Sequence, residues 1–136
     1  MWPKMEYNAE IHERGYQAIV FDFDDTLSEH PGGLGPPGPP IEGMPELLRD
    51  LKADGFHIVI QTCRGAQYWK GLIPDEQADP QYQFNMVKEW CEKYDVPCDT
   101  MWSQDKPLAV MYVDDRGYHF DGDVDALRKE IHRRYH

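Results

Sequence analysis

Three carboxylates fall within four positions, at Asp22, Asp24 and Asp25, directly after a short apolar run at 18–21. The residues of that run, Ala, Ile, Val and Phe, are typical of a short buried strand. Like charges at such close spacing repel one another, so a folded site that holds them needs a cation or a proton. Acidic residues at the carboxyl end of a buried strand also lie where open α/β sheets bind ligands. The sequence therefore indicates half of a metal site, with one carboxylate available for chemistry.

Three later groups could complete this site. Thr62 ends an apolar run, Lys106 precedes another, and the pair Asp114 and Asp115 follows that second run. Oxygen ligands with room for water favour Mg²⁺ over Zn²⁺, and the sequence holds no tight cluster of His and Cys residues. A hydroxyl and an ammonium beside Mg²⁺ would form a cradle for a phosphoryl group. A carboxylate next to that cradle can attack phosphorus, and a second carboxylate can transfer protons.

The elements that position these groups are predicted to form a β-α-β unit. Strands are expected over 18–22 and 57–62 because both are short apolar runs. A helix is expected over 44–54 because its apolar residues recur every three or four positions. A right-handed crossover makes the two strands parallel, so their carboxyl ends bring Asp22 and Thr62 to one edge of the sheet.

The remaining predicted elements are a helix over 81–94, a short strand over 98–102, a buried strand over 108–113 and a last helix that begins at Asp123. Asp123 suits the N-cap of the last helix, whose basic residues lie towards its C-terminus and match the helix dipole. The whole is predicted to be a small α/β sandwich around a mostly parallel sheet. The apolar faces expected for the two helices are Phe84, Val87, Cys91 and Tyr94, with Trp90 flanking, and Val124, Leu127 and Ile131.

The length of 136 residues fits one domain, 1–136, with a single core. Residues 1–16 are polar and are expected to form an N-terminal arm or a short helix. The Pro and Gly run at 31–40 can be neither helix nor central strand. We interpret 28–43 as a stiff flap loop near the acidic cluster rather than as a linker, because too few residues precede it to form a domain.

Charge and composition limit the classes of partner. A net charge of −11 argues against a large nucleic-acid footprint, which needs a basic face, but it allows small anionic substrates. No apolar run approaches the ~20 residues that a bilayer span needs. Three cysteines without a CxxC pair, and an N-terminus unlike a signal peptide, favour a cytoplasmic protein with reduced thiols.

The stretch 22–26, DFDDT, matches the DxDxT motif of the haloacid dehalogenase superfamily. Thr62 resembles the second motif of that family, Lys106 with its following Pro the third, and 114–115 the fourth. The four motifs occur in the family order and cover residues 18–115. This resemblance implies a Rossmann-like three-layer fold and Mg²⁺-dependent phosphoryl transfer through an aspartyl-phosphate, and most members of the family are phosphatases.

The resemblance also implies roles for single residues. Asp22 would be the nucleophile, and Asp24 would be the general acid and base, which indicates a phosphatase rather than a dehalogenase. Position 25 is often Gly in the family and is Asp here, which we interpret as a tolerated change. Arg64 is interpreted either as a contact to phosphate or the leaving group, or as a structural residue. The implied Mg²⁺ ligands are Asp22, the backbone carbonyl of Asp24, Asp114 and Asp115, which ligates through water or orients the other ligands. The implied phosphate-binding residues are Thr62 and Lys106, and Arg64 is a further candidate.

Members of this family often carry a cap domain after the first or second motif. About twenty residues separate Thr26 from the helix over 44–54, and the gap between Thr62 and the next helix is of similar size. Neither gap holds a domain of about 50 residues or more, so the protein is expected to lack a cap and to leave its site open. The flap 28–43 and the loop 65–80 would then be the specificity elements.

Several functions fit these motifs. The first is hydrolysis of a sugar phosphate, a nucleotide or another exposed phosphomonoester. The stretch 62–64 and the loop after it resemble the phosphatase half of polynucleotide kinase/phosphatases, which suggests a nucleic-acid 3′-phosphate end as an alternative substrate. A phospho-receiver module is a further alternative, although its acceptor Asp would stand where Thr62 stands. The last alternative is a catalytically silent, Mg²⁺-binding interaction protein.

Overall fold

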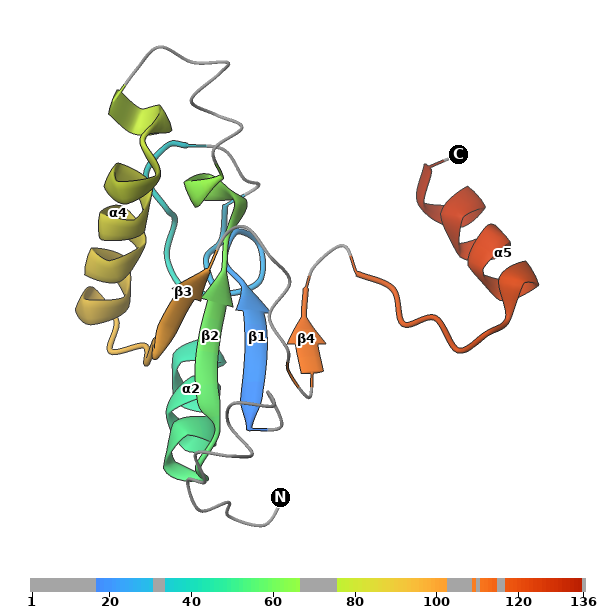
Figure 1. The fold of residues 1–136 in the computed structure, drawn as a ribbon, viewed down its shortest axis with the longest axis horizontal. Helices are drawn as coiled ribbons and strands as arrows, with labels where there is room; N and C mark the ends of the chain where they lie inside the picture. Colours follow the sequence, from blue (N-terminus) through green and yellow to red (C-terminus); the bar gives the residue numbers. More distant parts are fainter. Residues whose placement is uncertain are drawn as a thin grey trace.

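The structure is a computed structural model (Figure 1). The N-terminal arm 1–16, Lys106 and Asp115 lie outside the described residues, as does the middle of the predicted loop 65–80. The structure describes residues 17–30, 34–66, 76–102, 109, 111–114 and 117–135.

Within these described residues, four parallel strands form the sheet, in the order β3-β2-β1-β4. They are β1 (Ala18–Asp22), β2 (His57–Gln61), β3 (Thr100–Trp102) and β4 (Met111–Val113). The predicted α/β, Rossmann-like fold with a parallel sheet is confirmed by this topology. In the register, Phe21 pairs with Ile60 on one side and with Val113 on the other, so the residues that follow all three strands lie at the same edge.

The helices begin and end close to the predicted positions. The α-helices are α2 (Met44–Ala53), α4 (Pro80–Lys93) and α5 (Val124–Tyr135), and two short 3₁₀ helices are η1 (Cys63–Gly65) and η2 (Glu76–Ala78). Proline fits the first turn of α2 and of α4 because its missing N–H would have no partner there. No described helix is long and apolar enough to cross a membrane.

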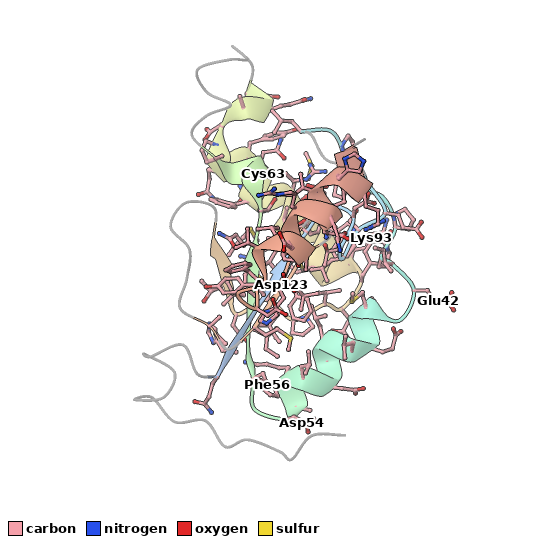
Figure 2. The ribbon with its side chains drawn as sticks, turned by 90° about the vertical axis from the view of Figure 1, so that its right-hand side faces the viewer. Glu42, Asp54, Phe56, Cys63, Lys93 and Asp123 are labelled. Carbon is pink, nitrogen blue, oxygen red and sulfur yellow. The ribbon has the colours of Figure 1, made fainter. Side chains whose placement is uncertain are left out.

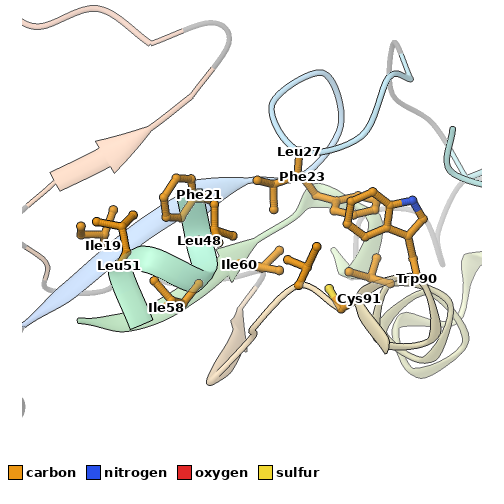
Figure 3. Close-up of a cluster of buried hydrophobic side chains, with 12 residues drawn as sticks. Ile19, Phe21, Phe23, Leu27, Leu48, Leu51, Ile58, Ile60, Trp90 and Cys91 are labelled. Carbon is orange, nitrogen blue, oxygen red and sulfur yellow. The ribbon is translucent and has the colours of Figure 1, made fainter. Parts of the chain in front are cut away.

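The main core lies between the sheet and the two helices α2 and α4, which cover the same face (Figures 1 and 3). Trp90 belongs to this core and packs edge-on against Phe23 at 5.0 Å between ring centroids, so the expectation that Trp90 only flanks the buried face is wrong. Helix α4 buries Gln83, Val87, Trp90 and Cys91 together, so Trp90 lies on its buried face. The buried core residues are Ile19, Phe21, Phe23, Leu27, Leu48, Leu51, Ile58, Ile60, Val87, Trp90, Cys91 and Val96.

Strand β4 differs from the prediction of a buried strand. Met111 is 57% exposed and Tyr112 is 37% exposed. The reason is the order of the strands, since among the described strands β4 pairs with β1 alone and stands at the edge of the sheet. A smaller cluster of Ala18, Val20 and Val59 lies on the face of the sheet away from the main core, and Ala109 packs against it.

Helix α5 forms as predicted but stands away from the sheet (Figure 1). Asp123 caps it, because Asp123 Oδ1 accepts a hydrogen bond from the Ala126 N–H at 3.0 Å. Val124 and Ile131, two residues of its predicted apolar face, are 57% and 48% exposed. The helices that pack on the sheet, α2 and α4, therefore form one layer, and α5 does not pack as a second layer.

Candidate active site

A cavity of about 300 Å³ opens at the carboxyl edge of β1, β2 and β4. Asp22 ends β1, and Thr62 and Asp114 directly follow β2 and β4, so the parallel register brings all three into the cavity wall. Figure 2 shows this edge at Cys63, which follows β2 and lies at the opposite end of the strand from Phe56. The other lining residues are Val20, Gln61, Cys63, Tyr112 and Val113.

Thr62 is held with its hydroxyl in a fixed position. The residue is 1% exposed, and its Oγ1 accepts a hydrogen bond from the Arg64 N–H at 3.2 Å, which caps η1. A hydroxyl that accepts one bond still has its own proton to donate. Thr62 can therefore donate a hydrogen bond to an anionic group in the cavity.

The carboxylate of Asp24 faces a different partner. Asp24 is not among the described residues that line the cavity. Asp24 is 8% exposed, and its two oxygens accept bonds from Arg64 Nε at 2.9 and 3.1 Å and from Arg64 Nη2 at 2.8 Å. His30 Nδ1 lies 3.5 Å from Asp24 Oδ1. The predicted acid and base is thus a buried member of an ion pair, two residues beyond the predicted nucleophile.

Arg64 is fully buried and points to Asp24. Its Nη1 donates to the carbonyl of Gly35 at 2.6 Å and to Gln83 Oε1 at 3.2 Å, and its guanidinium lies 5.6 Å from the ring centroid of Phe23. Arg64 is also not among the described residues of the cavity wall. Of the two interpretations of Arg64, the geometry favours the structural one over a contact with phosphate.

The turn after Asp22 is tightly wound. The carbonyl of Phe23 accepts hydrogen bonds from three successive amides, 26–28, at 2.9 to 3.3 Å. Asp25 has a φ of 59°, in the left-handed region that glycine adopts most readily and Asp tolerates better than most residues. The backbone at Asp25 therefore has a conformation that Asp or Gly adopts more readily than other residues do.

The donor set of the cavity fits a hydrated Mg²⁺ ion. The two carboxylates that line the cavity are Asp22 and Asp114, and Mg²⁺ is usually held by one or two carboxylates together with several waters. A volume of about 300 Å³ has room for such waters. Within the described part of the chain, no three His, Cys, Asp or Glu side chains cluster tightly enough to form a metal site by themselves.

Sequence reasoning predicted neither Gln83 nor the contact of His30 with Asp24. Gln83 is fully buried on α4 and donates to the carbonyl groups of Leu34 and Gln77 at 3.0 and 2.8 Å. A signal was present, because Gln83 lies four positions before the apolar Val87 and so falls on the buried face of the helix. His30 carried no such signal, since its approach to Asp24 depends on how the chain turns after β1.

Comparisons with known proteins agree with the fold. The chain matches no protein-family model, and the search of curated proteins found no match. A solved structure described as the conserved protein coded by a locus of Bacteroides thetaiotaomicron is similar, with a TM-score of 0.54, 18% identity, and coverage of 90% of this chain and 94% of that one. A crystal structure of a target from Vibrio cholerae has a TM-score of 0.51, 20% identity, and coverage of 87% and 98%. Both similarities show the fold alone.

Proposed function

We propose that this protein is a Mg²⁺-dependent phosphomonoester hydrolase that acts through an aspartyl-phosphate at Asp22. The observation that supports this most directly is the shared cavity wall of Asp22, Thr62 and Asp114. A nucleophilic carboxylate, a hydroxyl donor and a second carboxylate able to bind a cation are what phosphoryl transfer to an aspartate needs.

In the first step, an Asp22 carboxylate oxygen attacks phosphorus and the bond from phosphorus to the ester oxygen breaks. The leaving alkoxide takes a proton from Asp24 and departs as an alcohol. The Thr62 hydroxyl donates to a phosphoryl oxygen and stabilises the charge that develops there. A Mg²⁺ ion held by Asp22, Asp114 and the carbonyl of Asp24 would supply positive charge at the phosphoryl oxygens.

In the second step, water attacks the phosphorus of the aspartyl-phosphate, and Asp24 takes the proton of that water. Inorganic phosphate leaves and Asp22 is regenerated as a carboxylate. Asp24 Oδ2 accepts one hydrogen bond from Arg64 Nε and keeps a second lone pair that can receive this proton.

The direct test measures phosphate release, with and without Mg²⁺, from phosphorylated sugars, nucleotides, an aryl phosphate and a 3′-phosphorylated oligonucleotide. Asp22→Asn is expected to lose essentially all turnover, because an amide is a poor nucleophile at phosphorus. Asp25→Asn is the matched control, since this neighbouring residue is exposed, and it is expected to keep activity. Turnover that survives in Asp22→Asn would exclude Asp22 as the nucleophile.

A second measurement separates the enzyme from the alternatives. Acid quenching during turnover, followed by peptide mass spectrometry, is expected to find one phosphoryl group on Asp22. A phosphoryl group that forms from acetyl phosphate but is not turned over would indicate a receiver module. Mg²⁺ binding without phosphorylation or phosphate release would indicate a silent interaction protein.

A further inference from the structure

The Pro/Gly segment 34–40 is fixed to the body of the protein through its carbonyl groups. Proline has no N–H, so such a segment cannot satisfy its own carbonyls with a regular backbone ladder. Side chains from three other parts of the chain supply the donors instead. The bonds are Gln83 Nε2 to Leu34 O at 3.0 Å, Arg64 Nη1 to Gly35 O at 2.6 Å, and Trp90 Nε1 and Ser28 Oγ to Gly38 O at 2.8 and 3.3 Å.

Close backbone packing holds the same segment. A side chain at Gly38 would collide with the backbone carbonyl of Glu29, so this approach is open to glycine alone. The amide of Glu29 also donates to the carbonyl of Pro39 at 2.8 Å. The segment therefore lies against residues 28–29, which follow the DFDDT turn and are hydrogen-bonded to it.

Arg64 links this segment to the proposed acid and base. One fully buried guanidinium contacts both oxygens of Asp24, the carbonyl of Gly35 and Oε1 of Gln83. A planar fork of five N–H donors can make such contacts in several directions at once, whereas an ammonium group cannot reproduce the paired geometry. The orientation of Asp24 and the place of the segment are thus set by the same side chain.

Gln83 completes the connection from α4. Its amide nitrogen donates to Leu34 and Gln77, and its amide oxygen accepts from Arg64. Both ends of the buried side chain are therefore engaged, and a buried polar network of this kind becomes costly when one member is lost.

We propose that Arg64 and Gln83 are positioning residues that hold Asp24 and the segment 34–40 as one fixed wall, which begins two residues after Asp22 of the cavity. The wall orients the Asp24 carboxylate for proton transfer to the leaving group, and its hydrogen bonds hold the segment in one place, so that the segment does not move as a lid. This inference rests on the proposed phosphomonoesterase function. In this inference, Arg64 orients Asp24 for proton transfer and does not bind phosphate.

The test compares two substrates that differ in their need for a proton. An alkyl phosphate needs protonation of its leaving oxygen, whereas 4-nitrophenyl phosphate releases a stable phenolate without it. In Arg64→Lys and Gln83→Met, kcat for the alkyl phosphate is expected to fall about tenfold more than kcat for the aryl phosphate, as the loss of a general acid would produce. A structural defect that only lowers the active fraction would reduce both values equally.

Two further variants serve as the reference and the control for this comparison. Asp24→Asn sets the full size of the effect on the ratio of the two kcat values. Arg49→Lys is the matched control, because Arg49 is a partly exposed arginine on α2 that contacts Asp95 and not Asp24. An unchanged ratio in both Arg64→Lys and Gln83→Met, beside a changed ratio in Asp24→Asn, would overturn the inference and leave the proposed function standing.

Amide hydrogen exchange gives a readout that needs no activity. Exchange of the Glu29 and Ile41 amides, whose hydrogen bonds join the segment to the turn, is expected to accelerate about tenfold or more in Gln83→Met, which keeps the side-chain volume and removes the polar contacts. If Arg64→Lys does not fold, Gln83→Met decides alone. Should the wild-type protein release no phosphate, the proposed function fails, and unchanged exchange in Gln83→Met would show separately that the fixed wall is absent.

Discussion

The neighbouring residues Asp24 and Asp25 have opposite surroundings although both are acids of the same motif. Asp24 is buried against Arg64, whereas Asp25 is exposed and adopts a left-handed backbone conformation. The amide of Asp25 donates to the carbonyl of Ser28 at 2.8 Å and so helps to close the turn. At the scale of single residues, Asp24 therefore takes part in an ion pair, whereas Asp25 takes part in the turn.

The backbone of Asp25 gives a stability prediction. Asp25→Val is expected to lower the free energy of unfolding by about 1–2 kcal/mol, because a β-branched residue is strained at positive φ. Asp25→Gly is expected to be neutral or stabilising by less than about 1 kcal/mol, since relief of strain is partly offset by the entropy of the unfolded chain. Urea unfolding measures both changes.

The matched control is Asp54→Val, at an aspartate with an ordinary φ of −82°. Its effect on the free energy of unfolding is expected to stay within about 0.5 kcal/mol. Equal costs for Asp25→Val and Asp54→Val would contradict a conformational cause at Asp25.

At the scale of elements, helix α5 is stabilised by contacts within its own neighbourhood. Glu130 binds both Arg133 and Arg134, and Arg134 also donates to the carbonyl of Gly117 at 3.1 Å. The hydrogen bonds from Arg133 and Arg134 lower the pKa of Glu130 from 4.5 to about 2. Such a lowered pKa means that the folded helix favours the charged carboxylate.

The sign of this pKa shift predicts how α5 responds to acid. The contribution of Glu130 is fully present above the ordinary pKa of 4.5 and is lost as the pH falls through about 2. An NMR titration of the Glu130 side chain is expected to have its midpoint near 2. Arg133→Gln should raise this midpoint, because it removes the leading hydrogen bond. A midpoint of 4.5 in the wild-type protein would show that the contacts with the arginines are not maintained in solution.

At the scale of the whole molecule, the structure has one well-packed core and one helix that stands apart from it (Figures 1 and 3). Helices α2 and α4 bury their apolar faces against the sheet, whereas six of the seven exposed large hydrophobic residues in the described part of the chain fall between Met111 and Ile131. Stability is therefore expected to depend on the core between the sheet and these two helices.

Two matched truncations test this distribution of stability. Leu48→Ala, at a fully buried residue of α2, is expected to cost about 2–5 kcal/mol because it leaves a cavity in the core. Ile131→Ala, at a residue of α5 that is 48% exposed, is expected to cost less than about 1 kcal/mol. Thermal and urea unfolding measure both. A similar loss in the two variants would mean that α5 packs against the core in solution.

The pattern of apolar residues was enough to predict the elements and their parallel order. Short apolar runs determine the strands, and helical spacing determines α2 and α4, because each pattern acts over neighbouring residues. Parallel order then implies that Asp22, Thr62 and Asp114 meet at one edge, and the cavity there has all three in its wall. This much depends on local sequence and on the handedness of the crossover.

Only the tertiary structure decided the surroundings of each polar group. Strand β4 is exposed because of its place at the edge of the sheet, which its own apolar sequence does not encode. The carboxylate of Asp24 turns to Arg64, which is 40 residues away in the sequence, and Gln83 meets Leu34 across 49 residues. Periodicity reports which face of an element is buried, but the partner on that face depends on how distant segments pack. The DFDDT motif therefore determined where the acids gather, and the packing of α4 and the Pro/Gly segment decided which way Asp24 points.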